Sequence, residues 1–136
     1  MNIETLLKNE EGISLLPYRD TVGKLTIGIG RNIEDKGITI QEAVMLLKND
    51  IKEIGDTLSK YQWFSNLQAN SPRQAIIISM AFNMGIGGLL NFRKMIQCLE
   101  AKDYTGAAEE MLNSKWAAQV PNRAKRHSEI MKSGKW

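Results

Sequence analysis

The sequence predicts an α+β protein that is mostly α-helical, with a small β lobe near the N-terminus joined by a long helix to a helical C-terminal lobe. Two observations predict this class. Glycines and a proline interrupt residues 13–38 too often for a helix, whereas apolar residues over 40–58 repeat at spacings of three and four. A chain of 136 residues can bury a sizeable core, so we expect one domain over 1–136.

The first element is a short helix that ends at Glu11. Asn2 suits its N-cap, and Gly12 can adopt the positive φ that ends helices. Residues 13–38 follow as the β lobe, in which short strands are joined by turns, including a hairpin turn at 21–23. The lobe therefore begins directly after a helix that ends in a carboxylate.

Start and stop signals divide the remaining residues into helices. Thr39 and Glu42 form a capping box that opens a connecting helix over 39–60. The motif Ser71-Pro72 starts the segment AIIISMAFNMG, which is apolar on nearly all sides, so we expect a buried central helix that the glycines of GIGG break. Three further helical patterns cover 92–99, 107–112 and a basic segment opened by Pro121.

The composition limits the kinds of functional site that the chain can form. Cys98 is the only cysteine and His127 the only histidine, so the chain can build neither a disulfide framework nor a Cys/His metal cluster. We expect no metal and no other cofactor. The N-terminus lacks an export signal, and no run of eighteen apolar residues occurs, so we expect a cytosolic product without stable membrane insertion.

The charge is unevenly distributed. Residues 114–136 carry a net charge of +5, whereas the rest of the chain carries −2. A basic end favours an anionic partner such as a nucleic acid, a membrane surface or a cell wall, although a solvated helix face has the same pattern. Charge alone leaves these readings open.

Two carboxylates near the β lobe are the candidate catalytic groups. Glu11, in the last turn of its helix, faces the negative end of the helix dipole, which favours a protonated acid. Asp20 lies in a polar turn among Arg19 and Lys24, where it stays ionised. An acid beside an ionised carboxylate is the pair that glycoside hydrolysis uses. Both residues are also ordinary at such places, so position alone does not establish catalysis.

Two neighbouring features add to this hypothesis. Thr26 lies on the far arm of the predicted hairpin, where its hydroxyl could approach Asp20 and help to hold a water molecule. The glycines of GIG at 28–30 lack the rest of a phosphate-binding fingerprint. We therefore interpret them as a place where the backbone approaches a bulky ligand closely.

A set of motifs spread over nearly the whole chain carries a family resemblance. The set is MNI at the start, Glu11-Gly12, Tyr18, Asp20-Thr21, Gly23, TIGIG at 26–30, Phe82 with Met84-Gly85, Trp116, and PNRAKR at 121–126. It resembles the T-even phage lysozymes of glycoside hydrolase family 24. The spacing of Glu11, Asp20 and Thr26, together with the PNRAKR block, is specific to that family.

The resemblance implies a lysozyme-like fold in which residues 1–12 join 61–136 in the helical lobe. It also implies roles for individual residues. Glu11 would protonate the glycosidic oxygen between N-acetylmuramic acid and N-acetylglucosamine, Asp20 would activate water beside Thr26, and the anomeric carbon would be inverted. The substrate-binding residues would be Gly30, Asn32, Phe82 and Arg123. Arg123 would lie close to Glu11, where its charge opposes the effect of the helix dipole.

The same resemblance implies the biological setting. The partner would be the glycan strands of peptidoglycan, and a separate pore-forming holin would release a monomeric enzyme from the cytoplasm of the host bacterium. The enzyme would then act on the cell wall after permeabilisation of the inner membrane, and nucleic acid would not be a partner.

The chain departs from the family pattern at several positions. Arg31 replaces the usual histidine after the TIGIG strand, and we expect it to form a permanent ion pair, with Asp50 as the candidate partner. The segment 32–39 is shorter than in the T-even enzymes, which predicts a trimmed β lobe. Met95 and Glu110 replace two small polar substrate-facing residues, so those contacts are not carried over.

Three alternative functions stay open. A lytic transglycosylase cleaves the same polymer but needs no water-activating carboxylate, so Asp20 argues against it. The basic C-terminal segment with Trp116 and Trp136 could disrupt membranes or bind nucleic acid, but its apolar stripe is narrow enough to pack on a core. A catalytically inactive wall-binding protein is the third alternative.

Overall fold

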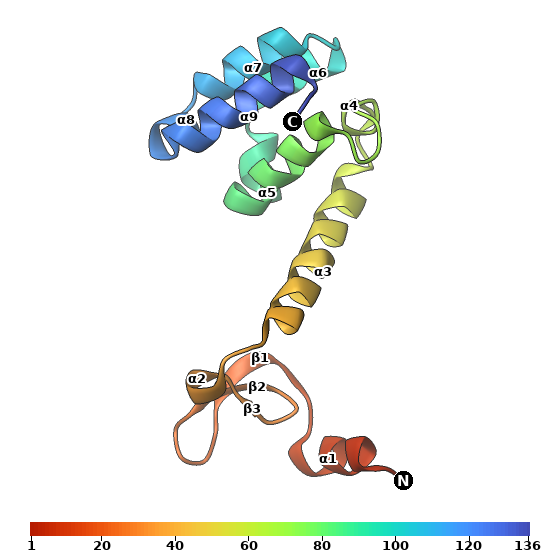
Figure 1. Ribbon diagram of the computed structural model, residues 1–136, viewed down its shortest axis with the longest axis vertical. Coiled ribbons are helices and arrows are strands. Elements are labelled where there is room, and N and C mark those ends of the chain that lie inside the picture. Colours follow the sequence, from red (N-terminus) through yellow and green to blue (C-terminus); the bar gives the residue numbers. More distant parts are fainter. The chain divides into compact units, whose positions relative to one another are not determined.

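The computed structural model describes residues 1–136 as two compact units, Met1–Leu46 and Leu47–Trp136. Nine helices and one three-stranded antiparallel sheet make up the chain, which confirms the predicted mostly helical α+β class (Figure 1). The expected grouping of residues 1–12 with the helical lobe stays a prediction.

The first unit contains the sheet and the short helices around it. Its elements are α1 (Ile3–Glu11), β1 (Ser14–Arg19), β2 (Leu25–Gly28), β3 (Arg31–Asn32), α2 (Ile33–Lys36) and the start of α3 (Ile40–Leu58). Asn2 caps α1 by accepting a hydrogen bond from the Thr5 N–H at 2.9 Å. Gly12, at φ 70°, donates its N–H to the Lys8 carbonyl and ends the helix. Both predicted caps of α1 are therefore confirmed.

The sheet has the strand order β1-β2-β3 and places Thr26 at its centre. Thr26 pairs with Tyr18 on one side and with Asn32 on the other. Its side chain is 3% exposed and is one of two buried polar side chains in the protein. The predicted hairpin is confirmed, because residues 20–24 form the turn between β1 and β2.

Helix α2 occupies part of the segment that the sequence assigned to the β lobe. Asn32 caps it by accepting from the Asp35 N–H at 3.1 Å, and Gly37, at φ 66°, ends it. A single turn is too short to produce a helical repeat in the sequence, so only its two caps could have indicated it.

Arg31 connects the sheet to the start of α3, and it pairs with Glu42. The Arg31 guanidinium lies 2.8 Å from the Glu42 carboxylate and also donates to the Gly37 carbonyl at 3.1 Å. The expected ion pair forms, but the expected partner, Asp50, was wrong. Asp50 lies about 12 Å further along the helix, whereas Glu42 is in the first turn, within reach of β3.

Glu42 also completes the predicted capping box. Its carboxylate accepts from the Thr39 N–H at 2.9 Å, and the Thr39 hydroxyl accepts from the Glu42 N–H at 3.1 Å. The Thr39 N–H, followed by the Arg31 guanidinium, lowers the pKa of Glu42 to about 2. One carboxylate therefore caps α3 and holds the end of the sheet.

The second unit consists of helices. After the remainder of α3 come α4 (Gln62–Ser65), α5 (Pro72–Leu90), α6 (Arg93–Glu100), α7 (Tyr104–Leu112), α8 (Lys115–Gln119) and α9 (Pro121–Ser133). Helix α9 packs against α5, α7 and α8 (Figure 1). The apolar stripe of α9 includes Ala124 and Met131, both fully buried. This confirms that the basic C-terminal segment packs on a core.

Helix α5 contributes the largest share of that core. Ser71 caps it by accepting from the Gln74 N–H, as predicted, and its buried residues are Ile76, Ile77, Met80, Ala81 and Leu89. The prediction that GIGG breaks the helix was only partly right. Gly85, at φ 83°, kinks the helix, which then resumes and continues to Leu90. By length and composition alone α5 could cross a membrane, a test that core helices of soluble proteins also pass.

We predict that Glu42→Gln destabilises the protein in a pH-dependent way. A carboxylate with a lowered pKa in the folded state adds stability above its ordinary pKa of 4.5, and this stability is lost as the pH falls towards about 2. The melting temperature of Glu42→Gln should be about 2–4 °C below wild type at neutral pH, and the difference should vanish near pH 2.

The matched control for this prediction is Asp50→Asn on the same helix. Thermal melts monitored by circular dichroism should show no change for that variant at any pH. A larger effect of Asp50→Asn than of Glu42→Gln would contradict the assignment of the ion pair.

Candidate active site

The carboxylate of Glu11 lies against the backbone at Gly30. Gly30, at φ 69°, belongs to the turn between β2 and β3. A Cβ atom at this position would lie 2.9 Å from Glu11 Oε2, closer than real Cβ contacts come. Only glycine therefore allows this carboxylate and this turn to meet in the observed geometry. The two sequence-predicted residues are brought together.

Glu11 and Gly30 line one pocket of about 530 Å³ in the first unit. The pocket is lined by Glu4, Leu7, Lys8, Glu11, Ile29 and Gly30. The sequence analysis did not identify Glu4, Leu7 and Lys8. They lie seven, four and three residues before Glu11, so all four side chains lie on one face of α1. This spacing is the signal that could have found them.

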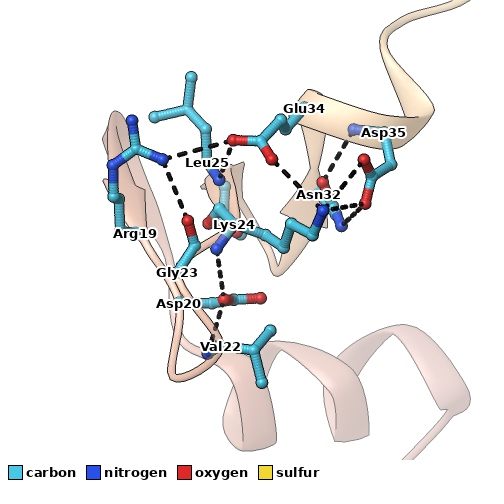
Figure 2. Close-up of polar contacts among 10 residues, drawn as sticks. Arg19, Asp20, Val22, Gly23, Lys24, Leu25, Asn32, Glu34 and Asp35 are labelled. Atoms are coloured by element: carbon cyan, nitrogen blue, oxygen red, sulfur yellow. Dashed lines mark hydrogen bonds and ion pairs between the residues drawn. The ribbon is translucent and has the colours of Figure 1, made fainter.

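Asp20 is held by the hairpin turn through one of its two carboxylate oxygens. Oδ1 accepts from the Val22 N–H at 3.0 Å and from the Lys24 N–H at 2.8 Å (Figure 2). These two bonds fix the orientation of the side chain. Oδ2 has no protein partner and is available to another donor. The turn therefore positions a half-buried carboxylate with one oxygen free.

The cations around Asp20 pair with carboxylates of α2 rather than with Asp20. Arg19 lies 3.3 Å from Glu34, and Lys24 lies 3.4 Å from Glu34 and 3.3 Å from Asp35 (Figure 2). Asp35, followed by Glu34, raises the pKa of Lys24, and Asp20 adds a smaller effect. Backbone N–H groups, not the expected cations, are thus the direct partners of Asp20.

The Thr26 hydroxyl follows Asp20 in the same hairpin. It donates to the Lys24 carbonyl at 2.9 Å. Because its only proton is used there, the oxygen can act towards any further group only as an acceptor. Asp20 Oδ2 is likewise an acceptor. Both groups are therefore available only as hydrogen-bond acceptors.

The remaining predicted binding residues fall into two places. Asn32 is in the first unit, where its side chain is occupied in capping α2 and donates to Asp35 at 3.1 Å. Phe82 and Arg123 are in the second unit and line one apolar pocket of about 460 Å³ there, together with Ser79. Arg123 donates to the Ser79 hydroxyl at 2.9 Å.

Met95 and Glu110, two of the residues that depart from the family pattern, line the same surface pocket but differ in burial. Met95 is 1% exposed and belongs to the core, so its replacement of a small polar residue extends the apolar packing. Glu110 is half-buried and lines a surface pocket of about 440 Å³ beside Phe92. No group of three or more His, Cys, Asp or Glu side chains is close enough together to hold a metal ion.

Comparisons with known proteins identify the family of this chain. The family described as phage lysozyme matches residues 8–129. The probable T4-type lysozyme 1 of Dictyostelium discoideum is 30% identical over 161 aligned positions, which cover 98% of this chain and 95% of the relative. Because that alignment is longer than the chain, the relative carries residues that this chain lacks.

Two phage proteins are also similar. The endolysin of Salmonella phage P22 is 30% identical over 126 positions, which cover 87% of this chain and 84% of the relative. The pre-baseplate central spike protein Gp5 of Enterobacteria phage T4 is 27% identical over 98% of this chain, but the match covers only 28% of Gp5. With a family match over most of its length and relatives of this kind, the chain belongs to the phage lysozyme family and is a glycoside hydrolase of the muramidase class.

Proposed function

We propose that the protein is an endolysin-type lysozyme that hydrolyses the β-1,4 bond between N-acetylmuramic acid and N-acetylglucosamine in peptidoglycan, with inversion at the anomeric carbon. The observation that carries the proposal is the contact between the Glu11 carboxylate and Gly30, in the same unit as the half-free carboxylate of Asp20. Family membership supports the reaction class.

In this mechanism Glu11 is the general acid. It gives its proton to the glycosidic oxygen, the bond between that oxygen and C1 of N-acetylmuramic acid breaks, and the N-acetylglucosamine product leaves with a free 4-hydroxyl. The Gly30 backbone fits this role, because the absence of a side chain leaves room for the carboxylate itself at the wall of the pocket. Glu11 is left ionised and regains a proton from solvent.

Asp20 and Thr26 act on the attacking water. The water donates one hydrogen to Asp20 Oδ2 and the other to the Thr26 oxygen, which leaves a lone pair directed at C1. Asp20 takes the proton as the new C–O bond forms on the face opposite the leaving group. An inverting pair needs its carboxyl groups about 6.5–9.5 Å apart, so that water fits between substrate and base.

Four further residues are proposed to bind the glycan. Gly30 and Asn32 provide the contacts from the sheet, and Phe82 and Arg123 provide those from the helical unit. Phe82 offers an apolar surface in the same pocket where Arg123 offers a cation. These residue types suit a sugar polymer that carries acidic groups.

The proposed biological role is lysis of a host bacterium. The monomeric enzyme would accumulate in the host cytoplasm and reach its substrate after a separate holin opens the inner membrane. The endolysin of phage P22 among the relatives supports a role in lysis. Neither nucleic acid nor stable membrane insertion is part of the proposal.

We predict that Glu11→Gln lowers muramidase activity by about 10²–10⁴-fold, because glutamine cannot donate the proton. The measurement is the rate at which purified protein clears a suspension of cell walls, together with the appearance of new reducing ends. Glu10→Gln, one residue earlier in α1, is the matched control and should clear walls at the wild-type rate. Equal clearing by Glu11→Gln and wild type would end the enzymatic proposal.

Asp20→Asn provides a second prediction, because asparagine keeps the oxygen that the turn holds but removes the base. Its activity should fall by about 10²–10⁴-fold without loss of folding. Asp35→Asn, which changes a nearby carboxylate, is the control variant.

The stereochemistry is tested separately. Proton NMR of fresh digests by the wild-type enzyme should show the α anomer of N-acetylmuramic acid first. An initial β anomer would exclude inversion, and an anhydro sugar end would indicate a lytic transglycosylase.

The basic C-terminal segment predicts salt-sensitive binding to the wall. Residues 114–136 carry +5, and four of their cations lie on exposed positions of α9 and just after it, at Lys125, Arg126, Lys132 and Lys135. Raising the ionic strength from about 0.02 M to about 0.3 M shortens the screening length several-fold. Binding to insoluble walls should weaken accordingly in a pull-down assay. Binding that does not change with salt would exclude the electrostatic contribution.

A further inference from the structure

The pocket of Phe82 and Arg123 contains a chain of hydrogen bonds that the proposed mechanism does not use. Arg123 Nη2 of α9 donates to the Ser79 hydroxyl of α5 at 2.9 Å, and the same Ser79 oxygen lies 2.8 Å from His127 Nε2. His127 lies one turn after Arg123 on α9. Three side chains from two packed helices are therefore connected through one hydroxyl.

Counting the hydrogen-bond donors among these three side chains indicates which of them donates in each hydrogen bond. The guanidinium can only donate, so the Ser79 oxygen accepts from it. The single proton of Ser79 is then free to be donated to His127 Nε2, an arrangement that requires this nitrogen to be unprotonated. The imidazole is neutral in this arrangement and carries its proton on Nδ1.

The surroundings of His127 favour this neutral ring. Its Nδ1 is enclosed and has no hydrogen-bond partner. The ring packs against Trp116 of α8, with 6.0 Å between ring centroids. Trp116 is held in turn by its N–H, which donates to Asn83 of α5 at 2.8 Å. The ring is therefore fixed in place, and its only polar contact is Ser79.

The charges around the ring have the same effect. Burial, followed by the positive charges of Arg123 and Arg126, lowers the pKa of His127 below its ordinary value of 6.5. Both arginines belong to α9. The groups that α5 and α8 bring to the ring, Ser79 and Trp116, are uncharged, and α7 adds no charge there. The ring is therefore neutral at pH 7 and becomes charged only as the pH falls through the lowered pKa.

We propose that Ser79 and His127 are positioning residues that hold the Arg123 guanidinium for the glycan, and that protonation of His127 releases it. A protonated Nε2 donates instead of accepting, so the Ser79 oxygen would face two cationic donors. The imidazolium and the guanidinium then repel each other, and Arg123 leaves its anchored position. This inference rests on the proposed binding role of Arg123.

The first test is spectroscopic and does not depend on activity. Because His127 is the only histidine in the chain, ¹⁵N-correlated NMR of the full protein reports on this ring alone. We expect the Nδ1–H form at pH 7 and a titration midpoint below 6.5. We also expect Ser79→Ala to change the ratio of the two neutral ring forms. A ring that carries its proton on Nε2 would overturn the proposal.

The second test measures activity on soluble glycan fragments between about pH 8 and about pH 5. Ser79→Ala should raise KM about 10-fold at neutral pH, with a smaller effect on kcat, because a hydrogen bond to a charged group is lost. His127→Leu should have a similar effect. His127→Gln, which keeps an acceptor oxygen but cannot be protonated, should rescue KM and remove its rise at acid pH.

Controls separate positioning from stability and from the proposed function itself. Ser59→Ala removes a hydroxyl, directly after α3, that donates only to the Gly55 carbonyl of that helix, and it should leave KM unchanged at every pH. In an Arg123→Ala background, Ser79→Ala should have no further effect on KM. Wild-type activity with a KM insensitive to Ser79→Ala and to His127→Leu would refute this inference alone, whereas a wild type without muramidase activity would refute the proposed function.

Discussion

The close approach of the Glu11 carboxylate to Gly30 is the constraint on which the candidate site depends. A carboxylate can occupy this position only because residue 30 has no side chain and because its backbone adopts a positive φ. The position of the carboxylate is set in turn by Gly12, which ends α1 one residue after Glu11. Two glycines with left-handed backbone, eighteen residues apart, thus bring the end of a helix and the turn of a sheet together.

The rest of the first unit holds that turn in place. Thr26, at the centre of the sheet, pairs with strands on both sides, and Arg31, directly after Gly30, is bound to Glu42 at the start of α3. The arginine in place of a histidine makes this connection permanent, because a guanidinium stays charged at every physiological pH. Its partner carboxylate, with a pKa near 2, stays charged as well. The connection between Arg31 and Glu42 is therefore insensitive to pH in the neutral range.

The sequence predicted those parts of the fold that are encoded locally. The Asn2, Thr39 and Ser71 caps, the hairpin at 21–23 and the helical repeats each depend on residues close together in the chain, and the structure confirms them. The parts that it missed depend on distant contacts or on single turns. Helices α2, α4 and α8 have four or five residues each, too few for a periodic pattern. Helix α5 bends at Gly85 but does not end there, and this depends on the core contacts of Leu89. Arg31 pairs with Glu42 because of where β3 meets α3. Of the candidate site, the family pattern indicated Glu11 and Gly30 separately, but not that the two are in contact. The ion pairs of Arg19 and Lys24 with α2 could not be predicted without knowing that α2 exists.

The two units differ in how their charged groups are held, and this difference has a functional meaning. In the first unit the arginine next to the site is bound by a carboxylate, so its position is independent of pH in the neutral range. In the second unit Arg123, which we propose to bind the glycan, donates to a serine hydroxyl, and that hydroxyl is hydrogen-bonded to the only histidine of the chain. A hydroxyl accepts from a cation without neutralising it, so Arg123 keeps its full charge for an acidic ligand, whereas a carboxylate partner would cancel that charge. In this arrangement the hydroxyl still has its own proton to donate. The neutral imidazole of His127 is the acceptor within hydrogen-bond distance. The acid sensitivity that we propose for the position of Arg123 therefore follows from holding this cation with a serine hydroxyl instead of a carboxylate.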